Sequence, residues 1–288
     1  MDVVSHADFP RLHPTFGHPE SPERLAVLLE AFPDFVACAP ASEKDVLRCH
    51  APEHLELVRS IGEPTWLDLD TVASETTFEA ALLAVGAAIE ATRRAGFAFV
   101  RPPGHHALRA RAMGFCLFDN VAIAARWAQQ ELEVERVAVV DFDVHHGNGT
   151  EDLFRGDDSV LFVSLHQWPF WPGTGGPDDQ AATTVNVPMR AGSGNADYRQ
   201  AFEQVVEPAL ARFQPELLLV SAGFDAHEDD PLADIRLTED GFRELAGRCA
   251  AMAPRCAAVL EGGYNLDTLP RLVAAALAGF RGDDGRRL

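Results

Sequence analysis

Long apolar runs are missing from this chain of 288 residues. No stretch approaches the roughly 18 apolar residues of a membrane-spanning helix, and the N-terminal MDVVSHADFPRLHPTF has no basic region followed by an apolar one. The five cysteines are odd in number and include no C-x-x-C pair, which is typical of proteins from reducing compartments. The sequence therefore predicts a cytoplasmic protein with no membrane partner.

Basic residues are also scarce. Lys and Arg total 24 against 44 for Asp and Glu, which gives a formal net charge of -20. This charge argues against a direct nucleic-acid partner, and it suits either a cationic substrate or an ordinary solvated surface. The hydrophobic content of 47% is enough for a sizeable core, so a disordered or fibrous protein is excluded.

No linker, low-complexity tract or internal repeat marks a boundary, so we expect a single domain over residues 1–288. Short apolar runs alternate with longer helical patterns. Uninterrupted runs of this kind are typical of parallel strands with helices on both faces, so the predicted fold class is α/β with a central, mainly parallel sheet. The predicted strands are FAFV (97–100), VAVVDF (137–142), VLFVSL (160–165), LLLVSA (217–222) and CAAVLE (256–261).

Helical patterns lie between the predicted strands. The segment 76–96 is rich in alanine, with acid early, arginines late and a glycine after its end, as the helix dipole and a C-cap favour. Ser21 is followed by Pro22, as at a helix N-cap. Pro208 and Pro270 should kink or bound their helices. The other predicted helices cover 119–132, 197–213, 238–252 and 266–280.

Four of the predicted strands end in ionisable or phenolic residues beside glycines. FAFV is followed by RPPGHHA, VAVV by DFDVHHGNGT, LLLVSA by GFDAH, and CAAVL by EGGYN. Ligands of open parallel sheets collect beyond the carboxyl ends of the strands, so these four loops could converge on one site.

Asp143 and His145 are two residues apart, so in an extended segment their side chains leave on the same side. Asp225, at the end of another predicted strand, could supply a third ligand. Two carboxylates and an imidazole suit Zn²⁺ or Fe²⁺ and leave room for water and substrate. Taken singly, the aspartates and histidines could serve as caps or hydrogen-bonding groups, and Tyr264 could simply pack. Together, at equivalent strand ends, they favour a metal hydrolase site.

These motifs resemble a known family. RPPGHHA, GFCLFDN, DFDVHHGNGT, PGTG, SAGFDAH and EGGYN, in this order, are similar to motifs of the zinc-dependent histone deacetylases and the bacterial histone deacetylase-like and acetylpolyamine amidohydrolases. The resemblance runs from residue 18 to about residue 280 and is closer to the class II branch. It implies an arginase/deacetylase-like α/β domain and hydrolysis of an N-acetylated primary amine to acetate and free amine.

The resemblance also assigns the catalytic residues. Zinc falls on the three residues of the spacing argument, with Fe²⁺ as an alternative metal in the cell. Of the tandem histidines, His106 is implied as general base and then acid, and His105 as an electrostatic or relay partner. Asp141 is implied to orient His105, and Asn148 to face His106. Tyr264 is implied to donate a hydrogen bond to the carbonyl oxygen as it becomes an oxyanion.

Substrate-binding residues follow by the same resemblance. Phe115 and Trp171 match the aromatic walls of a narrow channel, although phenylalanine or tyrosine is usual in place of the tryptophan. Gly114 permits close approach, and Leu232 stands where a polyamine-selective relative has glutamate. Asp70 resembles a rim carboxylate that holds the substrate backbone. Arg24 resembles the arginine that lies at an inner acetate-release cavity in the family.

Potassium is a second implied cofactor, bound mostly through main-chain oxygens beside the zinc strand. The inner position is matched by residues of the two central apolar runs, and the outer position is matched in part. The residues implied in these sites are Asp141, Asp143, His145, Ser164 and Leu165 for the inner one, and Phe154, Asp157 and Val160 for the outer one.

The leading hypothesis is therefore deacetylation of acetyl-lysine in a peptide or protein. An enzyme alternative is a small-molecule amidohydrolase for acetylpolyamines or other acylamides. A third hypothesis is a catalytically silent protein that binds acylated ligands, which the full set of site residues argues against. A further alternative is an arginase-like enzyme with two manganese ions, but the sequence contains only one full set of metal ligands.

Overall fold

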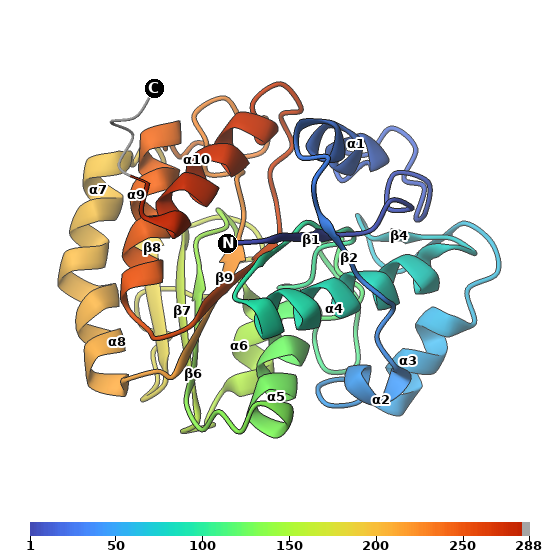
Figure 1. The fold of residues 1–288 in the computed structure, drawn as a ribbon, viewed down its shortest axis with the longest axis horizontal. Coiled ribbons are helices and arrows are strands. Elements are labelled where there is room, and N and C mark those ends of the chain that lie inside the picture. Colours follow the sequence, from blue (N-terminus) through green and yellow to red (C-terminus); the bar gives the residue numbers. More distant parts are fainter. Residues whose placement is uncertain (284–288) are drawn as a thin grey trace.

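An eight-stranded sheet forms the centre of the computed structural model, which describes residues 1–283 (Figure 1). All seven strand pairings are parallel, in the order β2-β1-β5-β10-β9-β6-β7-β8, and two further strands, β3 and β4, form a small antiparallel pair. The predicted α/β fold with a mainly parallel sheet is confirmed. The strands are β1 (Val3–Ser5), β2 (Val36–Ala37), β3 (Thr65–Trp66), β4 (Val72–Ala73), β5 (Phe97–Ala98), β6 (Val137–Asp141), β7 (Val160–Gln167), β8 (Thr184–Met189), β9 (Leu217–Ala222) and β10 (Cys256–Leu260).

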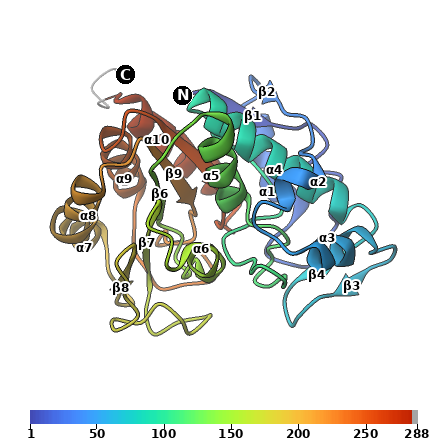
Figure 2. The ribbon, with the colours of Figure 1, turned by 90° about the horizontal axis from the view of Figure 1, so that it is seen from below.

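Helices cover both faces of the sheet, as Figures 1 and 2 show. One face packs against α4 and α5, and the other against α9 and α10, whose Phe242 and Phe280 contact phenylalanines of the sheet region. The helices are α1 (Pro22–Ala31), α2 (Glu43–Val46), α3 (Pro52–Arg59), α4 (Thr77–Arg94), α5 (Asn120–Glu131), α6 (Asn148–Phe154), α7 (Asn195–Ala201), the π-helical turn η1 (Phe202–Val206), α8 (Glu207–Phe213), α9 (Glu239–Ala251) and α10 (Leu269–Arg281).

This double cover explains the uninterrupted apolar runs. Every residue of β6, β7, β9 and β10 is buried, because a side chain that leaves either face meets a helix or a loop. Their register places Val140 beside Val163 on one side and Val220 on the other. β-branched side chains in these positions fill the space between the sheet and the helices, so the central strands form the core of the fold.

Three strands of the sheet were not predicted. β1 and β2 have only three and two residues, too short for a periodic signal. β8 is one of the two edge strands, and two of its six residues, Val185 and Pro188, are partly exposed. An edge strand tolerates a proline and partly exposed side chains, because no neighbouring strand hydrogen-bonds to its outer side.

The predicted helices hold with local differences. Segment 197–213 is broken by η1, and Pro208 lies in the first turn of α8, while Pro270 lies in the first turn of α10. Ser21 occupies the N-cap of α1 in an extended conformation, but its side chain does not cap the helix. The left-handed residue that ends α4 is Ala95, with φ 54°, rather than the glycine that follows it.

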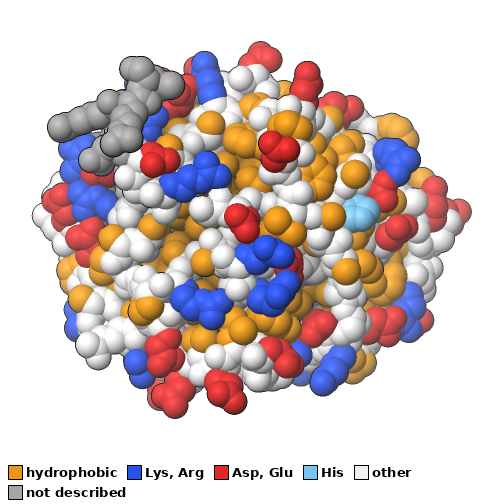
Figure 3. Space-filling view, in the orientation of Figure 1, with side chains coloured by type: hydrophobic (Ala, Val, Ile, Leu, Met, Phe, Trp, Pro, Cys, Tyr) orange, Lys and Arg blue, Asp and Glu red, His pale blue; other side chains and the backbone are white. Residues whose placement is uncertain are grey.

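Charged side chains of both signs are interspersed over the face seen in Figure 3. Among the described residues no helix combines the length and apolar character needed to cross a membrane.

Candidate active site

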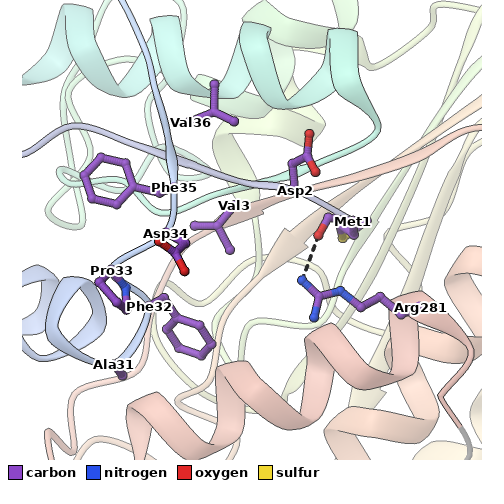
Figure 4. A pocket seen from close by; sticks show the side chains of 10 residues that line it. All are labelled: Met1, Asp2, Val3, Ala31, Phe32, Pro33, Asp34, Phe35, Val36 and Arg281. Atoms are coloured by element: carbon purple, nitrogen blue, oxygen red, sulfur yellow. Dashed lines mark hydrogen bonds between the residues drawn. The ribbon is translucent and has the colours of Figure 1, made fainter.

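The four loops with ionisable residues meet because of the strand order. β5, β10, β9 and β6 are neighbours in the sheet, although they are far apart in the sequence. Since the strands are parallel, all four loops leave from the same edge. A different hollow, of about 590 Å³, lies beside Val3, where β1 begins, and its walls include Phe32, Phe35 and Arg281 (Figure 4). It contains none of the predicted site residues.

The three predicted metal ligands lie together and are buried. One candidate ligand atom from each of Asp143, His145 and Asp225 lies within 4.8 Å of the others. His145 Nδ1 is 3.1 Å from Asp143 Oδ1 and 3.1 Å from Asp225 Oδ2. Among residues 1–283 this is the group of His, Cys, Asp and Glu side chains with metal-binding spacing.

The backbone fixes the orientation of both carboxylates. The Val144 N–H donates to Asp225 Oδ1 at 2.9 Å, and the Gly262 N–H donates to Asp143 Oδ2 at 2.8 Å. A Cβ at Gly262 would lie 2.6 Å from Asp143 Oδ2, so only glycine lets this loop approach. Burial and the neighbouring Asp143 raise the pKa of Asp225 to about 6. Two buried anions this close favour a bound cation.

The tandem histidines have different partners. His105 Nδ1 lies 2.9 Å from Asp141 Oδ2, and His106 Nδ1 lies 2.8 Å from Asn148 Oδ1. The predicted neighbours of both histidines are therefore in place. Because the amide oxygen can only accept, Nδ1 of His106 carries the proton and its Nε2 keeps a lone pair. The two rings lie 3.9 Å apart between centroids.

Their surroundings push the two pKa values apart. Burial by itself lowers the pKa of His105, but the Asp141 and Asp143 carboxylates outweigh it and hold this pKa well above its usual range. Burial and the charges of His105 and His145 hold the pKa of His106 well below its usual range. These two directions favour a neutral His106 that can accept a proton, beside a protonated His105.

A narrow cavity of about 210 Å³ leads to these groups. Gly114 adopts φ 57°, and a Cβ there would lie 2.6 Å from His106 Cδ2, as the predicted close approach requires. Trp171 packs edge-on against His106, with ring centroids 4.7 Å apart, and Phe115 lies 5.8 Å from the ring of Tyr264. The cavity is lined by Asp70, His106, Gly114, Phe115, His145, Phe170, Trp171, Leu232 and Tyr264.

Phe170 was not predicted as a wall residue. Its ring stacks on the His145 ring at 5.4 Å, whereas the ring of Trp171, which is 39% exposed, meets the same histidine edge-on at 5.8 Å. The segment WPFWP contains three aromatic residues, and composition alone could not decide which of them point inward.

A second residue missed by the sequence reasoning, Asp230, holds two wall residues. Its Oδ2 accepts a hydrogen bond from the Tyr264 N–H at 2.8 Å, and its Oδ1 accepts one from the Leu232 N–H at 3.0 Å. Burial and the charge of Asp225 raise the pKa of Asp230 to about 7. One buried carboxylate therefore holds the backbone of two residues that line the cavity.

Glu261 has a similar supporting role beneath the histidines. Its Oε2 accepts hydrogen bonds from the Gly104 N–H at 2.7 Å and the His105 N–H at 3.2 Å, and burial raises its pKa to about 8. The glutamate follows directly after β10, which is the one signal that could have identified it.

Arg24 lies beneath Tyr264 and does not line the cavity. Its guanidinium is 5.0 Å from the centre of the tyrosine ring, and it donates to the carbonyl oxygens of Gly263 at 2.8 Å and Glu261 at 2.5 Å. The side chain is fully buried and also contacts Glu20. These contacts hold the loop that carries the tyrosine; the implied acetate-release role stays a prediction.

Asp70 lines the cavity, and its role as a rim carboxylate stays a prediction. Burial and the adjacent Asp68 raise its pKa, and its backbone oxygen lies 2.9 Å from His18 Nε2. The Phe115 N–H donates to Thr71 Oγ1 at 3.0 Å, so the rim loop and the channel wall are tied together.

The implied potassium residues have varied surroundings. Ser164 pairs in register with Asp141, and its hydroxyl lies 2.9 Å from His166 Nδ1, while Leu165 is buried. At the outer position, Arg126 donates to Asp157 at 2.5 Å and lies 4.7 Å from the ring centre of Phe154. The Arg126 guanidinium therefore lies beside the outer position. Val160, also assigned to this position, is buried. Both potassium sites remain predictions.

Comparisons with known proteins agree with the geometry. The Histone deacetylase domain matches residues 18–280. A histone deacetylase-like amidohydrolase of Pseudomonas aeruginosa is 39% identical over 282 residues, which cover 88% of this chain and 74% of that protein. The polyamine deacetylase HDAC10 of Mus musculus is 36% identical over 320 residues, which cover 98% of this chain but 48% of that protein.

A solved structure shows the same fold. The crystal structure of the HDA15 HD domain matches with a TM-score of 0.93 and 33% identity, covering 98% of this chain and 90% of that one. The chain therefore belongs to the histone deacetylase family, and the resemblance seen in its motifs is confirmed. It is a hydrolase of the deacetylase and amidohydrolase type.

Proposed function

We propose that this chain is a zinc-dependent deacetylase that hydrolyses acetyl-lysine in a peptide or protein to acetate and the free amine, with residues 1–288 forming one catalytic domain. The observation that carries the proposal is that a three-ligand cluster, the imidazole of His106 and the phenol of Tyr264 meet at one narrow cavity. The slender cavity suits the methylene stem of an acylated lysine.

The chemistry of the donor set supports the metal. Asp143, His145 and Asp225 supply two carboxylate oxygens and an imidazole nitrogen, a set that fits Zn²⁺, with Fe²⁺ as the alternative in the cell. When bound, such an ion polarises a carbonyl and lowers the pKa of water. Potassium at the inner site would further stabilise the strand that carries the ligands.

The protein side chains then divide the remaining work. Nε2 of His106 takes a proton from the attacking water and returns it to the leaving amine as the C–N bond breaks. The cationic His105, held by Asp141, stabilises the negative charge that develops nearby. The Tyr264 hydroxyl donates to the amide oxygen as it becomes an oxyanion. Trp171 and Phe115 flank the substrate stem and exclude bulk water.

A second candidate is hydrolysis of acetylpolyamines. The mouse relative that is named a polyamine deacetylase favours it, and the net charge of -20 would attract a polycation. At position 232 the cavity wall carries leucine, where a polyamine-selective relative has glutamate, which argues for the peptide substrate. For location we propose the cytoplasm, supported by five cysteines that are all buried and unpaired.

One kinetic panel tests these proposals. Purified protein loaded with Zn²⁺ or Fe²⁺ is assayed with an acetyl-lysine peptide, acetylspermidine, acetylputrescine and longer acyl-lysines, and bound metal is measured in the same preparation. We expect the highest kcat/KM with the peptide. Preference for acetylspermidine would establish the second candidate, and tight binding of all substrates without product would show a silent binding protein.

A further inference from the structure

A groove of about 330 Å³ lies beside the mouth of the catalytic cavity. It is formed by the loop before α1, the first turn of α1 and the loop after Tyr264. The lining residues are Pro14, Thr15, Phe16, Gly17, His18, Ser21, Pro22, Glu23 and Leu266. None of these residues has a role in the hydrolysis proposed above.

His18 forms the wall between the groove and the catalytic cavity. Its ring lines the groove, and it packs edge-on against Phe115, which lines the cavity, with ring centroids 4.5 Å apart. Nε2 of the His18 ring lies 2.9 Å from the backbone oxygen of Asp70, which lines the catalytic cavity. Leu266 of the groove lies two residues after Tyr264 of the cavity, so the same loop borders both openings.

The groove is bordered by exposed apolar side chains and by an acidic one. Phe16 is 90% exposed, an unusual position for a large aromatic side chain, and Leu266 is 36% exposed. Glu23 is exposed on the rim, and hydrogen bonds from Ser21 and from its own backbone lower its pKa, so the carboxylate is ionised at neutral pH. A long side chain with a methylene stem and a cationic tip complements both features.

We propose that this groove binds a Lys or Arg side chain of the substrate polypeptide, two residues from the acylated lysine. This inference rests on the proposed function. In an extended peptide, side chains at positions i and i+2 leave on the same side about 6.7 Å apart, so they can enter two neighbouring openings whose walls, His18 and Phe115, are in contact. The stem lies on Phe16 and Leu266, and the cationic tip meets Glu23.

The geometry also says why a peptide fits better than a linear amine. An occupant of both openings must branch at the mouth, because the His18 ring stands between them. A polypeptide branches at every residue, whereas an acetylated polyamine is unbranched and can follow only one of the two paths.

Matched peptides test the inference. Each carries a central acetyl-lysine, with Arg, its uncharged analogue citrulline, Leu or Gly placed two residues before or after it. For the better of the two placements we expect kcat/KM to be about fivefold higher for Arg than for citrulline, since an exposed ion pair or a cation on an aromatic face contributes a factor of up to about five. Leu should exceed Gly by a similar factor.

Two variants assign the contributions. Glu23→Gln should make Arg and citrulline equal and leave the Leu preference intact, while Phe16→Ala should reduce the preference for both Arg and Leu. Glu30→Gln, on the same helix but outside the groove, and Leu57→Ala, an exposed apolar residue on α3, are the controls and should change nothing. Acetylspermidine turnover should be unaffected by either groove variant.

The outcomes separate this inference from the proposed function. If terminally blocked acetyl-lysine, which is too short for the groove, is hydrolysed while the four peptides are indistinguishable, the groove has no such role. Equal loss of acetylspermidine turnover in Glu23→Gln would also overturn it. If no acylated amine is hydrolysed by the metal-loaded protein, the proposed function itself fails.

Discussion

Removal of one oxygen atom from Tyr264 isolates its chemical role. In Tyr264→Phe the ring keeps its contacts with Phe115, 5.8 Å away, and with the guanidinium of Arg24, 5.0 Å away. None of the described residues accepts a hydrogen bond from the hydroxyl, so the substitution breaks no internal bond. Burial raises the pKa of the phenol well above its usual range, so the group is a donor throughout the neutral range. We expect less than about 1 kcal/mol of change in the free energy of unfolding.

The effect on catalysis should be much larger. Loss of one preorganised donor to an oxyanion typically costs about 2.7 to 4 kcal/mol, or a factor of about 10² to 10³ in kcat. Steady-state kinetics with an acetyl-lysine peptide measure this loss, and metal analysis of the same samples should find equal zinc in variant and wild type, because Tyr264 is not a predicted ligand. A kcat within twofold of the wild type would refute the role.

Three further predictions follow from the buried polar groups. Asp230→Ala should lower kcat by about tenfold through displacement of Tyr264, and the loss should vanish when it is introduced into Tyr264→Phe; equal losses in both backgrounds would mean a merely structural role. Asp143→Ala removes one of the three ligands and should leave the protein with well below one equivalent of zinc after dialysis; full retention would contradict the ligand assignment. Burial lowers the pKa of His50 to about 3, so the unfolded chain binds this proton more tightly, and stability is fully present above pH 6.5 and lost as the pH falls towards 3. Between pH 6.5 and 5 we expect a contribution of about 2 kcal/mol, seen as a steeper loss of stability in urea titrations of the wild type than of His50→Gln, and parallel curves would show that the histidine titrates normally.

The sequence predicts the centre of this fold better than its edges. The strands with continuous apolar runs, such as β6 and β9, are buried on both faces and so leave a clear signal. β8 has partly exposed residues, and β1 is three residues long, so neither produces a pattern that differs from a loop. Their pairing is decided by tertiary contacts, which a single sequence does not display.

The residues of the candidate site also differ in how far the sequence predicts them. The i, i+2 spacing of Asp143 and His145 is local, and the structure brings both to Asp225 from a neighbouring strand. Asp230 could not be found, because its importance depends on the backbone N–H of Tyr264, 34 residues further along the chain. A carboxylate in a loop is ordinary until the partner that it meets is known.

The last strand of the chain lies in the interior of the sheet. β10 pairs with β5 on one side and β9 on the other, so among the described strands it joins the set β2-β1-β5 to the set β9-β6-β7-β8. If the other strands pair before residues 256–260 leave the ribosome, the growing chain has two half-sheets, and the edges of β5 and β9 lack their hydrogen-bonding partner. Such edges invite aggregation, so this protein should depend on holding chaperones late in synthesis, and a stop codon before β10 should yield insoluble product rather than a smaller folded domain.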